Sequence, residues 1–187
     1  GVVLLALGAG KAQMVNVVHL GKPPDVLAEK AREILAAHGN VNPPADTARG
    51  FEHDLDYVRY VEQSDPTVGR WDRVADGRPA AIYFWYRQSP RELAPQTPES
   101  EGRVRYDDPP LVVPGMARVK LDPMGRLLEL VVVPSPAQEA GAPAADFDPS
   151  VLFEEAGLDI RTFTPAEPVR IPPIFAETRQ AWEGPLL

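Results

Sequence analysis

The acidic segment from Glu52 to Asp56 holds the densest group of side chains that could take part in chemistry. In an extended chain Asp54 and Asp56 share one face, and their carboxylates are the oxygen ligands that a hard cation such as Ca²⁺ prefers. A calcium loop needs more carboxylates nearby, and only Glu52 and Glu62 are available. Two facing carboxylates would also suit a hydrolase. Because a solvated acidic strand edge gives the same pattern, we expect no metal site here.

Motifs for nucleotide chemistry are incomplete. Gly10-Lys11 lacks the glycine five residues earlier and the Ser or Thr that a phosphate-binding loop needs, since Leu5 and Ala12 stand there. Asp146-Phe147 is followed by Asp148 where the metal-binding triplet of a kinase requires glycine. The serines form no nucleophile elbow, and the three histidines are scattered. We therefore expect no catalytic residue and no cofactor in this chain.

A candidate binding surface lies on the aromatic segment 80–89. Its aromatic and β-branched residues, bounded by Pro79 and Pro90, predict a strand at the centre of the core. Alternation directs one set of side chains towards the main helix: Ile82, Phe84 and Tyr86. The other face, with Trp71 as a neighbour, would contact a peptide, a glycan or an aromatic ligand through Tyr83, Trp85 and Arg87. Arg87 would select an anionic or carbonyl-bearing group on that ligand. The alternative is ordinary packing under the chain's own proline-rich segment.

The elements that must position these residues are a helix and a hairpin. A helix is expected from Asp25 to about His38, because prolines and an acidic residue precede it and Gly39 follows. Its buried stripe would be Leu27, Ala31, Ile34 and Leu35. A hairpin is expected to join 116–121 to 126–133 through the turn Asp122–Gly125, next to the aromatic strand. We expect loops at 40–48 and 87–110, and a strand in the later part of 51–61.

Composition restricts the class of partner. The chain has 187 residues, a formal net charge of −8, 22 prolines and no cysteine. A nucleic-acid partner is not expected, since phosphate binding needs clustered Lys and Arg. The many prolines favour short elements joined by long ordered loops. The absence of cysteine excludes disulfides but fits either redox compartment.

The predicted organisation is an α+β fold with an antiparallel sheet packed by one main helix, followed by a smaller, partial second unit. We assign residues 15–134 to the main domain, 135–147 to a linker and 148–187 to the second unit. The second unit is expected to begin with a helix that has Asp148 as its N-cap and Pro149 as its first residue. Residues 1–14 are expected to be a membrane-proximal segment or the end of a transmembrane helix. Its apolar run Val2–Leu7 fits a buried strand, the end of a transmembrane helix or a signal-peptide remnant. The first residue is Gly1 rather than Met, so we expect a fragment or a processed product.

Several phrases resemble a known class of receptor. They are Lys22–Leu35, Arg78–Pro90, Val119–Glu129 and Gln180–Gly184. Together they are similar to the region that follows the transmembrane segment in membrane-anchored bacterial serine/threonine kinases of the acidobacterial type. The helix-plus-hairpin arrangement is also similar in style to extracytoplasmic PepSY domains. The first resemblance implies a preceding membrane helix and an extracytoplasmic, periplasmic location, and it carries no catalytic residue over to this chain. It also implies that ATP and Mg²⁺ would bind only in the kinase domain of a parent protein.

The expected function is therefore a non-catalytic extracytoplasmic sensing or interaction module of a receptor-like serine/threonine kinase, with an unknown ligand or protein partner. The alternative is a free-standing carboxylate-dependent hydrolase or carbohydrate-active enzyme that uses residues such as Glu52, Asp54 and Asp56. A cleft with facing carboxylates would favour the alternative.

Overall fold

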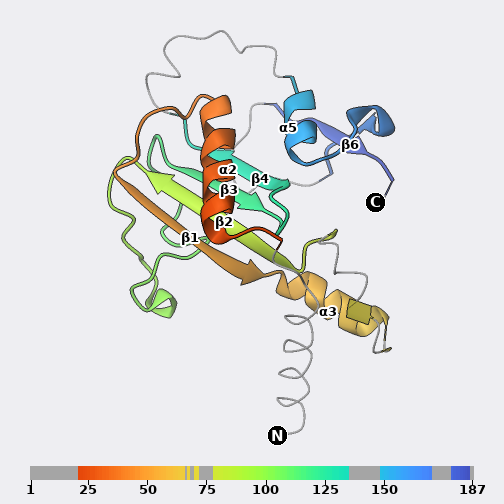
Figure 1. Cartoon of the computed structure of the whole chain (residues 1–187), viewed down its shortest axis with the longest axis horizontal. Helices are drawn as coiled ribbons and strands as arrows, with labels where there is room; N and C mark the ends of the chain where they lie inside the picture. Colours follow the sequence, from red (N-terminus) through yellow and green to blue (C-terminus); the bar gives the residue numbers. More distant parts are fainter. Residues whose placement is uncertain are drawn as a thin grey trace, which may run out of the picture. The chain divides into compact units, whose positions relative to one another are not determined.

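The computed structural model describes residues 21–65, 67, 70–71, 78–134, 148–169 and 178–185. It shows an α+β protein with an antiparallel four-stranded sheet, in the order β1-β2-β3-β4, and a separate two-stranded sheet, β5-β6 (Figure 1). The described residues before 135 and those after 147 form two compact units. The expected membrane-proximal segment 1–14 and the linker 135–147 lie outside the described residues.

Among its described residues, the first unit has the helices α2 and α3, the four-stranded sheet and the short 3-10 helix η2. Their bounds are α2 Pro24–Ala37, β1 Asp46–His53, α3 Leu55–Ser64, β2 Ile82–Ser89, η2 Pro98–Ser100, β3 Ala117–Leu121 and β4 Leu127–Val132.

Helix α2 is the predicted main helix, and it packs across β2 and β3 on one face of the sheet (Figure 1). Proline is tolerated in its first turn, and Asp25 complements the positive end of the helix dipole. The helix ends before Gly39, whose φ of 81° is a conformation that glycine adopts at little cost. The buried stripe is Leu27, Ala28, Ala31, Ile34 and Leu35. Prediction and structure agree here.

Strand β2 is central, and all eight of its residues are buried. It pairs with β1 on one side and with β3 on the other. The predicted hairpin is confirmed as β3 and β4, with a turn closed by the Gly125 amide donating to the Asp122 carbonyl at 2.9 Å. The buried Asp122 carboxylate also accepts from the amides of Met124 and Arg126. The hydrogen bonds of Asp122 and Gly125 in this short connection therefore hold the ends of β3 and β4 together.

The expected strand in the later part of 51–61 is wrong. The strand β1 lies earlier and begins at Asp46, inside the segment expected to be a loop, and Leu55–Ser64 is the helix α3. Asp54 explains the change, because its carboxylate accepts a hydrogen bond from the Tyr57 amide at 2.9 Å and so caps the helix. Val58 and Val61, three residues apart, then share the buried side of the helix.

The second unit consists of α5 Ser150–Glu155, η3 Ile160–Thr162 and the paired strands β5 Thr164–Ala166 and β6 Ala181–Glu183. The helix α5 starts one residue later than expected, because Pro149 rather than Asp148 is its N-cap. The Asp148 carboxylate still accepts a hydrogen bond from the Ser150 amide at 2.9 Å. Phe153 makes edge-to-face contacts with Phe163 and Trp182. None of the described residues of this unit is buried.

Candidate functional site

The segment from Pro90 to Gly115 lies over the face of the sheet opposite α2 and is called the covering segment below. The side chain of Arg87 holds it there by hydrogen bonds. The Arg87 side chain is 0% exposed. Its Nη1 donates to the Arg105 carbonyl at 2.7 Å, and its Nη2 donates to the Pro109 carbonyl. Burial, together with the nearby Arg118, lowers the pKa of Arg87 to about 10. Arg87 therefore remains charged at neutral pH, and neutral carbonyl oxygens of the covering segment satisfy two of its nitrogens.

Tyr106 is the second anchor of the covering segment. Its hydroxyl donates to Glu129 Oε2 at 2.7 Å, and its carbonyl accepts from Arg118 at 3.1 Å. The Arg118 guanidinium lies 3.9 Å from the centre of the Tyr106 ring and also donates to Glu129. Tyr83 meets the same ring edge to face at 5.6 Å. Hydrogen bonding, cation–π attraction and ring contact thus hold Tyr106 against β2, β3 and β4.

Asp108 organises the remainder of the covering segment. This buried carboxylate accepts hydrogen bonds from the Ser100 hydroxyl, from the amides of Gln96 and Thr97, and from the Thr97 hydroxyl. The bond from Ser100 contributes most to lowering the pKa of Asp108 to about 2, and the donors at Gln96 and Thr97 add to it. The carboxylate is consequently ionised at neutral pH and closes a loop around η2.

A cleft of about 550 Å³ opens beside these anchors. Tyr83 and Glu52 line its sheet side, and their side chains are joined by a hydrogen bond of 3.2 Å from the tyrosine hydroxyl. Burial raises the pKa of Tyr83, and the charge on Glu52 adds to the rise, so this hydroxyl stays protonated. The covering segment supplies the rest of the lining, which includes Gln96, Thr97, Glu99, Arg105, Tyr106, Asp107 and Asp108. The lining has four carboxylates and one guanidinium, so its charged groups are predominantly acidic.

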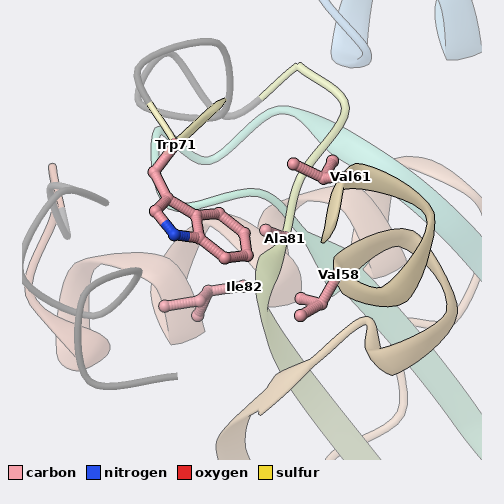
Figure 2. Packing of buried hydrophobic residues seen from close by; sticks show 5 residues of the cluster. All are labelled: Val58, Val61, Trp71, Ala81 and Ile82. Atoms are coloured by element: carbon pink, nitrogen blue, oxygen red, sulfur yellow. The ribbon is translucent and has the colours of Figure 1, made fainter. Parts of the chain in front are cut away.

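The structure separates the four residues predicted to form a ligand surface. Tyr83, Trp85 and Arg87 do share the face opposite α2, but they are only 7%, 4% and 0% exposed because the covering segment lies over them. Of these three, Tyr83 alone lines the cleft. Trp71 is not their neighbour. It packs with Val58, Val61, Ala81 and Ile82 in the cluster shown in Figure 2, and Ile82 points to the other side of β2.

The carboxylates of the hydrolase alternative are also separated. Glu52 lies in the cleft and accepts from Tyr83 and from the Tyr106 amide. Asp54 caps α3, and Asp56 forms an exposed ion pair with Arg59 at 3.3 Å. The expectation that Asp54 and Asp56 share the face of an extended segment is wrong, because the helix begins between them. Sequence reasoning did not identify Tyr106 or Asp108, although two consecutive aspartates before two prolines mark an ordered turn.

Within the described parts of the chain, no three His, Asp or Glu side chains gather closely enough to hold a metal ion. No described helix is long and apolar enough to span a membrane. No protein-family model, curated protein or solved structure matches the chain.

Proposed function

We propose that this chain is a non-catalytic sensing or interaction module on the extracytoplasmic side of a bacterial membrane, within a receptor-like serine/threonine kinase. The resemblance of Lys22–Leu35, Arg78–Pro90, Val119–Glu129 and Gln180–Gly184 to the extracytoplasmic part of such receptors supports the proposal. The kinase domain would precede a membrane helix on the cytoplasmic side, and ATP and Mg²⁺ would bind there. This chain would contribute the surface that a ligand or partner contacts.

The cleft between Tyr83 and the covering segment is the observation on which the proposal rests most. Its volume of about 550 Å³ is within the usual range for small-molecule sites. The lining presents carboxylates of Glu52, Glu99 and Asp107 and the amide of Gln96. Such a lining favours a small polar ligand with hydrogen-bond donors or a positive charge. It does not favour the anionic ligand expected from Arg87, because that guanidinium already donates to two carbonyl oxygens of the chain.

A ligand in this cleft would bridge the sheet and the covering segment. It would therefore change the stability of the arrangement in which Arg87 and Tyr106 hold that segment down. A ligand that binds this arrangement more tightly than an open one shifts the population towards it, and such a shift would bias a distant kinase domain.

The location can be tested without knowing the ligand. The reading frame upstream of Gly1 should encode a kinase domain and a membrane helix. Alkaline phosphatase fused after Leu187 of the full-length protein should be active in bacterial cells, and a fluorescent protein that matures only in the cytoplasm should stay dark. A start codon or a cleavable signal peptide immediately upstream would contradict the receptor proposal.

The role of the cleft can be tested on the full-length receptor in membrane vesicles. Glu99→Arg and Asp107→Arg reverse the charge of two exposed lining residues, and both should change autophosphorylation by the kinase domain relative to the wild-type receptor. Glu33→Arg, on the exposed side of α2, is the matched control and should have no effect. Equal autophosphorylation by all four proteins, with and without extracts containing small polar metabolites, would refute a signalling role for the cleft.

A further inference from the structure

The two edges of the four-stranded sheet differ in charge. Edge strand β1, Asp46–His53, carries four ionisable side chains among eight residues: Asp46, Arg49, Glu52 and His53. Edge strand β4, Leu127–Val132, carries one, Glu129, and that carboxylate accepts from Arg118 on the neighbouring strand at 2.8 Å. Charged side chains on an edge strand discourage pairing with another chain, so β1 is protected in a way that β4 is not.

The main chain of β4 has hydrogen-bonding groups on its outer side. Val133 donates to the Met116 carbonyl at 2.8 Å, so its N–H points inward to β3. Inward and outward directions alternate along an antiparallel strand, which turns the N–H and C=O groups of Leu130 and Val132 outward. These outward N–H and C=O groups form a row along β4. The register shift at Lys120/Leu121 ends the row on one side, and Pro134 ends it on the other. No described segment pairs with it.

We propose that β4 pairs with β4 of a second copy of this chain, antiparallel and around a two-fold axis at Val131. In this register Leu130 lies opposite Val132 of the second copy, and the reverse pair follows by symmetry. Each of these two pairs exchanges two main-chain hydrogen bonds. The outward N–H and C=O groups of Leu130 and Val132 would therefore all have a hydrogen-bond partner in each copy. Two four-stranded sheets would thereby join into one continuous sheet.

The side chains of β4 favour an identical partner. On one face Leu130 meets Val132, and on the other Val131 meets its own symmetry mate and Glu129 meets Val133. Glu129 therefore never faces itself, and the contact brings no two like charges together. This matters because each copy has a net charge of −8, so that identical copies already repel one another at long range. An isologous contact needs this kind of self-complementary surface. The inference goes beyond the proposed function and holds whether or not a kinase domain precedes the chain.

The natural absence of cysteine makes the register testable by crosslinking. Val131→Cys would place two thiols opposite each other in a non-hydrogen-bonded pair, where Cα atoms are about 4.5 Å apart, a separation that permits a disulfide. Thr47→Cys, exposed on the charged edge β1, is the matched control.

The oligomeric state provides a second test. The purified chain should show a molar mass that rises with concentration from 20.4 kDa towards twice that value. Val131→Lys should keep it at the monomer mass, because two like charges would face each other.

Three results would overturn the proposal. The first is a wild-type chain that stays monomeric at all concentrations while Val131→Cys forms no crosslinked dimer under mild oxidation. The second is crosslinking of Thr47→Cys to the same extent as Val131→Cys, which would indicate random collision. The third is a dimer that Val131→Lys leaves intact, which would place the contact on another surface or show a different partner strand. Circular dichroism of each variant checks that the fold is retained.

Discussion

The indole of Trp85 lies directly against Gly50, so that a Cβ added at Gly50 would come within 2.9 Å of the Trp85 ring. The two residues are paired across β1 and β2, and Trp85 is 4% exposed beneath the covering segment. The lack of a side chain at Gly50 is therefore a packing requirement, because it leaves room for the largest side chain of the central strand.

Gly50→Ala should destabilise the protein. The new methyl group must displace a buried, rigid ring, and overpacking of this kind costs about 1–3 kcal/mol, from which the entropic gain of about 0.5–1 kcal/mol for replacing glycine is subtracted. We expect a net loss of about 1–2 kcal/mol in the free energy of unfolding, measured with urea. In the background Trp85→Leu, the same substitution should cost less. An equal cost in both backgrounds would show that the indole is not the obstacle.

Phe84→Ala should be among the most damaging single substitutions in the first unit. Phe84 is 0% exposed and meets Phe51 edge to face, with ring centres 5.3 Å apart. Loss of the ring leaves a cavity in the middle of the sheet, and the expected cost is about 3–5 kcal/mol in the free energy of unfolding. Leu128→Ala, at a side chain that is 46% exposed, is the comparison and should cost much less. Similar denaturation midpoints for the two variants would contradict a central role for β2.

Local signals explain why parts of this fold could be predicted from the sequence. Helix α2 has a proline start, a repeating apolar stripe and a terminal glycine, and the hairpin has alternation on both sides of Asp122–Gly125. Each signal acts over a few residues, so no knowledge of distant contacts is needed. Helix α3 was mistaken for a strand because its closely spaced apolar residues satisfy both periods over a short length, and the deciding feature was the cap at Asp54.

The site depends on distant contacts, and for this reason the sequence predicted it poorly. Arg87 was expected to face a ligand, yet it donates to the carbonyls of Arg105 and Pro109, 18 and 22 residues later in the chain. Trp71 follows α3, so its location could not be assigned correctly once that helix was taken for a strand. The aromatic strand was correctly predicted at the centre of the core, but the segment that buries its second face is set by tertiary contacts.

Asp108 should make the protein sensitive to acid. Its pKa is lowered from 3.8 to about 2 in the folded protein, so the folded state binds the proton less readily than the unfolded state. The stabilisation from its ionised form is complete above about pH 4 and is lost as the pH falls towards 2. The free energy of unfolding should therefore differ most between wild type and Asp108→Asn above pH 4, and the difference should shrink below it. A difference that is constant from pH 6 to pH 2 would rule out this linkage.

The exposed Asp56 provides the control for that experiment. Its carboxylate forms an ion pair with the exposed Arg59 on the same helix, at 3.3 Å, and surface ion pairs contribute little. At neutral pH, Asp56→Asn should therefore leave the free energy of unfolding close to that of wild type, in contrast to Asp108→Asn.

Tyr106 should control how often the covering segment opens. Tyr106→Phe removes the hydrogen bond to Glu129, which we expect to cost about 1 kcal/mol because the acceptor is partly solvated and is also bonded to Arg118. Tyr106→Ala also removes the ring between Arg118 and Tyr83 and should open the segment more often.

Trypsin cleavage can measure this opening. Arg103 and Arg105 are exposed trypsin sites beside Tyr106, so the rate of cleavage there reports how often the covering segment opens. Cleavage should accelerate in the order wild type, Phe, Ala, while Tyr60→Ala, at a tyrosine that is 64% exposed on α3, should match wild type. If all four proteins were cut at the same rate, the segment would be held by Arg87 and Asp108 without help from Tyr106.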